Sequence, residues 1–118
     1  EETVRTAAAS DPWLKENPPE VQWLPIKFSP CRCDPDDPFV RVTRESIEAV
    51  TGEKTSLGAT PVGSDMRVPA LYADMPTVNI GPLGGGIHSP DEWVDVESYV
   101  DTVKMFAVLL IRWCGAVS

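Results

Sequence analysis

His88 is the only histidine of the chain and the first candidate for chemistry. It follows three consecutive glycines, Gly84, Gly85 and Gly86, which come shortly after an apolar segment with the pattern of a strand. In open α/β sheets, binding sites gather at the carboxyl ends of strands. An imidazole in such a place can bind a metal or transfer a proton, yet a single histidine is more often a surface or hydrogen-bonded residue. The residue types alone therefore leave the role of His88 open.

A serine hydrolase is the alternative that Ser64, His88 and Asp91 would allow. The residues around the serine lack the Gly-x-Ser-x-Gly pattern, which exposes a nucleophile at a sharp turn between a strand and a helix. A serine ahead of a short predicted helix commonly caps that helix instead. We therefore favour a capping role for Ser64.

Two cysteines, Cys31 and Cys33, are separated by a single residue, and Cys114 is the third. The spacing lacks the two intervening residues of the usual zinc or redox pair, and no second pair completes a site. We expect reduced, structural thiols, which are typical of a cytoplasmic protein.

The composition excludes two classes of partner. A formal net charge of −8 provides no basic surface for nucleic acid. The longest uninterrupted apolar run covers residues 105–111, far fewer than the roughly 20 residues needed to span a bilayer. The chain begins Glu1-Glu2-Thr3, without an initiator Met or a leader, so we expect it to be part of a longer polypeptide.

Helices and strands are predicted to alternate along the chain, which indicates an α/β fold. We expect one helix from Glu2 to Ser10 and a second from Pro38, capped by Asp37 and ended by Gly52. A third helix is expected to be capped by Ser64 and to run through Tyr72, and a final helix to be capped by Asp95. The predicted strands are 21–28, an edge strand interrupted by Pro25, and 77–80. Residues 81–86 are expected to be a loop. The final helix should bury a stripe formed by Val96, Tyr99, Val100, Val103, Phe106, Ala107, Leu110, Ile111 and Cys114, and the helix from Pro38 should bury Phe39, Val42, Ile47 and Val50.

Three motifs, in this order and at this spacing, resemble the C-terminal end of the acetylornithine deacetylase/succinyl-diaminopimelate desuccinylase family of dinuclear zinc amidohydrolases. They are Gly-Ser-Asp-Met-Arg at 63–67, Met-Pro-Thr-Val-Asn-Ile-Gly-Pro at 75–82, and His-Ser-Pro-Asp-Glu-Trp-Val at 88–94. The residues from Trp13 to Trp23 resemble the last helix and strand of that family's lid or dimerisation domain. The resemblance implies that residues 1–36 end the lid domain and that residues 37–118 are the C-terminal part of a zinc-peptidase-like catalytic domain.

The resemblance also implies roles for individual residues. His88 is the family's last metal ligand, at one of two zinc ions, with cobalt as a possible replacement. Arg67 resembles a clamp for the substrate carboxylate, against the alternative of a surface arginine paired with Asp65 or Asp74. Gly84, Gly85 and Gly86 resemble a substrate-side loop, against the alternative of a plain flexible loop.

No catalytic residue is expected within these 118 residues, because the family's general base and its other metal ligands lie upstream of the matching segment. The implied function is part of a cytoplasmic, homodimeric deacylase or peptidase, completed by the remainder of the parent chain, that hydrolyses N-acyl amino acids or small peptides. We expect this chain alone to be inactive. The alternative is a non-catalytic truncated chain that serves as an oligomerisation or structural piece.

Overall fold

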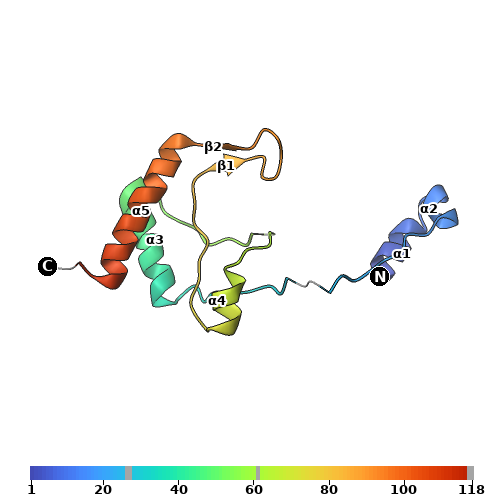
Figure 1. The fold of residues 1–118 in the computed structure, drawn as a ribbon, viewed down its shortest axis with the longest axis horizontal. Coiled ribbons are helices and arrows are strands. Elements are labelled where there is room, and N and C mark those ends of the chain that lie inside the picture. Colours follow the sequence, from blue (N-terminus) through green and yellow to red (C-terminus); the bar gives the residue numbers. More distant parts are fainter. Residues whose placement is uncertain (26–27, 61, 117–118) are drawn as a thin grey trace.

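The computed structural model of the chain describes residues 1–25, 28–60 and 62–116, with the elements shown in Figure 1. The helices are α1 Glu2–Ala8, α2 Pro12–Glu16, α3 Pro38–Thr51, α4 Arg67–Tyr72 and α5 Val96–Cys114, and the strands are β1 Gly84–Gly85 and β2 Trp93–Val94. Helices and a small sheet together agree with the predicted α/β class. The radius of gyration is 20.4 Å, compared with about 13 Å for a compact domain of roughly 100 residues. The chain is therefore extended.

The predicted helix from Glu2 to Ser10 is present as α1, which ends at Ala8, but the second short helix α2 was not predicted. The side chain of Asp11 starts α2. Its Oδ1 accepts hydrogen bonds from the backbone N–H groups of Trp13 and Leu14, both at 2.9 Å. Pro12 occupies the first turn, where its missing N–H costs nothing. Both helices lie apart from α3 and α5 (Figure 1).

Helices α3 and α5 lie side by side and form the packed part of the molecule (Figure 1). Their predicted caps are confirmed: Asp37 Oδ1 accepts from the N–H of Phe39 at 2.7 Å, and Gly52 ends α3 in the left-handed conformation at φ 72°. The ring of Phe39, at the start of α3, meets that of Trp113, at the end of α5, edge to face at 5.2 Å. The two helices therefore run antiparallel.

The buried face of α5 differs from the predicted one. Thr102, Met105 and Leu109 are buried. The residues of the predicted stripe are exposed, and the exposed fractions of its large side chains range from 44% at Phe106 to 70% at Val96. On α3 the fully buried residues are Val40, Thr43 and Ser46, and the predicted Phe39, Val42, Ile47 and Val50 are half-buried. Helix α3 therefore packs on the face of α5 that carries the polar Thr102 beside Met105 and Leu109. The broad apolar stripe of α5 remains on the outside.

Neither predicted strand is present among the described residues. Residues 21–25 and 28, and the whole of 77–80, form no ladder in the structure, and Ile26 of the first prediction lies outside the described residues. A strand requires a neighbouring strand to pair its N–H and C=O groups. An alternating or apolar sequence predicts an extended backbone but cannot supply that neighbour.

Helix α4 begins at Arg67, two residues later than the helix predicted to be capped by Ser64. The Ser64 hydroxyl accepts from the N–H of Met66 at a distance of 3.4 Å, so it organises the preceding turn rather than the helix itself. The later start places Pro69 in the first turn, where the backbone N–H groups have no helical partner. A helix that began directly after Ser64 would have held Pro69 beyond its first turn, where a proline is unfavourable.

Candidate functional site

The segment around His88 is a β-hairpin built on the glycines. In the antiparallel pair, Gly84 lies opposite Val94 and Gly85 opposite Trp93. The prediction that residues 81–86 form only a loop was therefore wrong at Gly84 and Gly85, which form β1. His88 lies in the connection between the two strands and is exposed.

Close packing in the hairpin explains why glycines occur here. A Cβ on Gly84 would lie 2.6 Å from the carbonyl oxygen of Trp93, and a Cβ on Gly85 would lie 3.0 Å from the indole nitrogen of Trp93. Gly86 adopts φ +70°, and a Cβ there would lie 2.8 Å from Ser89 Oγ. These contacts account for the three glycines without a ligand, so their predicted contact with substrate stays a prediction.

His88 has an unusual backbone conformation. Its φ is +65°, a left-handed value that is uncommon outside glycine. The N–H of Ser89 donates to the carbonyl oxygen of Gly86 at 2.8 Å, which closes a four-residue turn with His88 in its third position. A type II turn has this geometry, and its third position normally carries Gly or Asn. Such backbone outliers occur frequently at functional sites.

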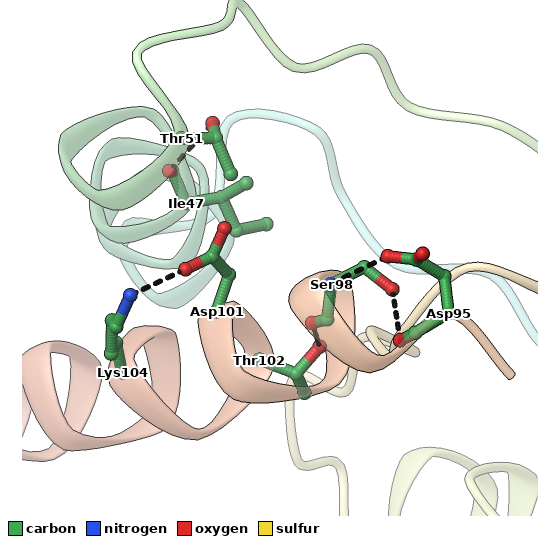
Figure 2. A network of polar contacts seen from close by, with 7 residues as sticks. All are labelled: Ile47, Thr51, Asp95, Ser98, Asp101, Thr102 and Lys104. Carbon is green, nitrogen blue, oxygen red and sulfur yellow. Dashed lines mark hydrogen bonds and ion pairs between the residues drawn. The ribbon is translucent and has the colours of Figure 1, made fainter.

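Asp95 and Ser98 anchor the hairpin to the first turn of α5, and Figure 2 shows the contacts between these two residues. The predicted cap is confirmed: Asp95 Oδ1 accepts from the N–H of Ser98 at 2.8 Å. The N–H of Asp95 donates to the carbonyl oxygen of Leu83 at 2.8 Å, and Ser98 Oγ accepts from the N–H of Leu83 at 2.9 Å. Both ends of the hairpin are thus held at the N-terminus of α5, which fixes the direction in which the His88 turn projects.

A cavity of about 670 Å³ lies between α3 and the irregular segments of the chain. Its lining includes Phe28, Arg44, Ser64 and Arg67. The hairpin residues from Gly84 to His88 are absent from this lining. The structure therefore separates the predicted site residues into two groups, with Arg67 in the cavity and the glycines and His88 on the hairpin.

Arg67 is the first residue of α4, and its guanidinium lies over the ring of Phe28, with Cζ 4.5 Å from the ring centroid. Its Nε is buried and has no hydrogen-bond partner within residues 1–25, 28–60 and 62–116. The ion pairs found in those ranges are Glu1 with Arg5 and Asp101 with Lys104. Arg67 therefore does not pair with Asp65 or Asp74, the surface arrangement that was the alternative.

Phe28 is a cavity residue that no motif in the sequence marks as part of a site. Its neighbours in the sequence predict an edge strand, and it is distant from Arg67 along the chain. No periodic pattern links a ring in an irregular segment with the first residue of a later helix. The contact could only be found in the structure.

A second polar cluster, formed by Arg44, Glu48 and Thr55, holds the segment after α3 against that helix. Glu48 Oε1 accepts from both the backbone N–H and the hydroxyl of Thr55, each at 3.1 Å. These bonds, the backbone one first, lower the pKa of the Glu48 carboxyl, with a smaller contribution from the charge of Arg44. Arg44 in turn donates to the hydroxyl and the carbonyl oxygen of Thr55, both at 3.2 Å. The cluster supports the wall of the cavity.

The described part of the chain does not by itself contain a metal centre. No group of three or more His, Cys, Asp or Glu side chains that could hold an ion occurs within it. Cys31 and Cys33 are half-buried and free, and Cys114 is free and exposed. No helix among the described residues is long and apolar enough to cross a membrane.

Comparison with known proteins gives consistent matches. Residues 13–112 match the peptidase family M20/M25/M40. Two succinyl-diaminopimelate desuccinylases from Bradyrhizobium sp., strains BTAi1 and ORS 278, are 31% and 30% identical over 93 residues, which is 79% of this chain and 23% of each relative. An N-formyl-4-amino-5-aminomethyl-2-methylpyrimidine deformylase from Halalkalibacterium halodurans is 26% identical over an alignment 127 residues long, which covers 97% of this chain and 29% of the relative. The chain thus spans less than a third of the length of these relatives. No solved structure matches it.

Proposed function

This chain belongs to the peptidase family M20/M25/M40, and we propose on that basis that it is part of a metal-dependent amidohydrolase. The proposed reaction is hydrolysis of the amide bond of N-acyl amino acids or small peptides by a metal-activated water. The match over residues 13–112 carries this proposal, because it includes both Arg67 and His88. Relatives that are a desuccinylase and a deformylase, both of which remove an acyl group, support it.

His88 fits one donor position of a zinc centre. Its imidazole is exposed on a turn whose backbone is constrained at φ +65°, and a neutral imidazole is a common zinc ligand. A complete centre needs further donors, which we assign to the rest of the polypeptide. Two zinc ions, or cobalt in their place, would polarise the amide carbonyl and supply the nucleophilic water.

Arg67 is the residue of this chain that we propose to bind the substrate, through its carboxylate. A guanidinium offers a planar fork of N–H donors that matches a carboxylate, and it stays charged at any working pH. A buried Nε without an acceptor in the described chain supports this role, because buried donors in native structures are almost always paired and a bound carboxylate would supply the partner. Gly84, Gly85 and Gly86 are proposed to let the backbone of the hairpin approach the same substrate.

The exposed stripe of α5 is proposed to pack against the remainder of the polypeptide. Val96, Val103 and Leu110 are 70%, 57% and 60% exposed, and they lie on the face of α5 opposite Met105. A helix with an apolar stripe normally buries it against another element. Residues 37–118 would then complete the catalytic domain. Residues 1–36 would end a lid domain through which the whole protein forms a homodimer.

The test is the substitution His88→Ala in the complete polypeptide. We expect the loss of one zinc ligand to lower turnover of an N-succinyl amino acid by at least 100-fold and to reduce the bound zinc, with a circular dichroism spectrum like that of the wild type. Asp91→Ala, on the same exposed turn, is the matched control. Normal turnover and normal zinc content in the His88 variant would remove His88 from the site. A wild-type protein without zinc or activity would instead favour the alternative, an oligomerisation or structural piece.

A further inference from the structure

We propose that Phe28 is a positioning residue for Arg67 and that its ring holds the guanidinium ready to bind a carboxylate in the cavity. This inference rests on the proposed function of Arg67 as a carboxylate-binding residue. Phe28 would not touch the substrate itself. It would change the affinity for the carboxylate through its contact with Arg67.

The contact between the two side chains has the geometry of a cation–π interaction. Arg67 Cζ lies 4.5 Å from the centroid of the Phe28 ring, well within the roughly 6 Å at which such contacts are attractive. The face of an aromatic ring carries partial negative charge, so it attracts a guanidinium without using any of its N–H donors. The donors of Arg67 thus remain free for an anion.

Arg67 needs such a support because polar contacts do not hold it. Its Nε has no hydrogen-bond partner in the described ranges, and it forms no ion pair there. An arginine side chain has several rotatable bonds, and ordering it on binding costs free energy. A ring that orders the guanidinium before the ligand arrives removes part of that cost, which increases the affinity.

Arg44 and Arg32 are the other arginines of the cavity lining, and neither has the same features. The guanidinium of Arg44 already donates to the hydroxyl and carbonyl oxygens of Thr55, both at 3.2 Å. Arg32 is exposed on an irregular segment. Arg67 is therefore the arginine of the lining that combines a stacked guanidinium with a buried donor awaiting an acceptor.

Gly63 lies against the same ring and provides a control. A Cβ on Gly63 would lie 3.4 Å from Phe28 Cδ1 and 3.6 Å from Cε1, which is ordinary van der Waals contact. Gly63→Ala should therefore leave the ring in place. It alters the neighbourhood of Phe28 without removing the face on which Arg67 rests.

The experiment is an NMR titration of the complete polypeptide with sodium acetate against sodium chloride at constant ionic strength. The signal of the Arg67 Nε–H group is identified by its loss in Arg67→Lys. Acetate should shift this signal to saturation, and Phe28→Leu should weaken the binding about threefold, the range expected when a partly exposed cation–π contact is lost. Phe28→Tyr, which keeps the ring, should restore the affinity. Gly63→Ala should bind acetate with the affinity of the wild type. The same holds for Phe106→Leu, a substitution at an exposed position of α5.

The outcomes separate this inference from the proposed function. Saturable binding by the wild type with equal affinity in Phe28→Leu would overturn the role of Phe28 and leave the carboxylate site intact. A wild type without a saturable acetate shift would overturn the carboxylate site itself. The side-chain protons of Arg67 give an independent check, because the ring current of Phe28 should move their signals upfield relative to Phe28→Leu. Identical proton shifts in the two proteins would overturn the stacking.

Discussion

Removing the cap of α5 should loosen the element that carries His88. Asp95 Oδ1 accepts a single hydrogen bond, from the N–H of Ser98 at 2.8 Å. The substitution Asp95→Ala removes this bond and leaves the backbone N–H of Asp95 bound to the carbonyl oxygen of Leu83. Loss of an N-terminal cap costs about 1 kcal/mol. The protection of the Ser98 amide against hydrogen exchange should therefore fall about fivefold.

Hydrogen exchange followed by NMR is the suitable assay, because it reports the opening of α5 residue by residue. The amide of Leu83, which donates to Ser98 Oγ at 2.9 Å, should lose protection together with that of Ser98. Asp95→Asn should retain most of the protection, since asparagine also caps helices well. Asp91→Ala, an exposed carboxylate on the hairpin turn, is the matched control and should change nothing.

Two results would refute this reasoning. Equal protection of Ser98 in Asp95→Ala and Asp91→Ala would mean that the cap does not stabilise the first turn. A loss at Ser98 without any loss at Leu83 would mean that the hairpin is not anchored through α5. In the second case another part of the protein would have to orient the turn that carries His88.

Three further predictions concern the site and its surroundings. The 118-residue chain by itself should bind zinc no tighter than a micromolar dissociation constant and hydrolyse no acyl amino acid, since one imidazole cannot hold the ion; sub-micromolar binding by calorimetry would contradict this. In the complete protein, Arg67→Lys should raise KM for a substrate with a free carboxylate while kcat is kept, because an ammonium cannot form two parallel bonds; an unchanged KM would contradict it. The pKa of Glu48 is lowered in the folded chain, so its bonds to Thr55 stabilise the fold above the ordinary carboxyl pKa. That stability should be lost as the pH falls through the lowered value. The Thr55 amide should then lose protection against hydrogen exchange, after correction for the intrinsic exchange rate. In Glu48→Gln, which cannot titrate at this position, the protection of Thr55 should show no such change with pH.

The sequence by itself determined the features that depend on neighbouring residues. Asp37 and Asp95 cap α3 and α5 as predicted, and Gly52 ends α3, because a cap is formed by a side chain and backbone N–H groups two or three positions away. The motifs around Arg67 and His88 indicated a family that the comparison with known proteins confirmed. Motif order and spacing are properties of the linear chain, so they could be read without coordinates.

Only the tertiary structure decided which surfaces meet. The stripe of α5 that includes Val103 and Leu110 is the most apolar face of the helix, yet α3 packs on the side of Thr102 and Met105. Gly84 and Gly85 proved to form a strand paired with Val94 and Trp93, and Arg67 proved to rest on Phe28. Hydrophobic periodicity shows that a face is apolar but not what covers it. Strand pairing and side-chain stacking depend on residues distant in the sequence, and their positions are set by the packing of the whole chain.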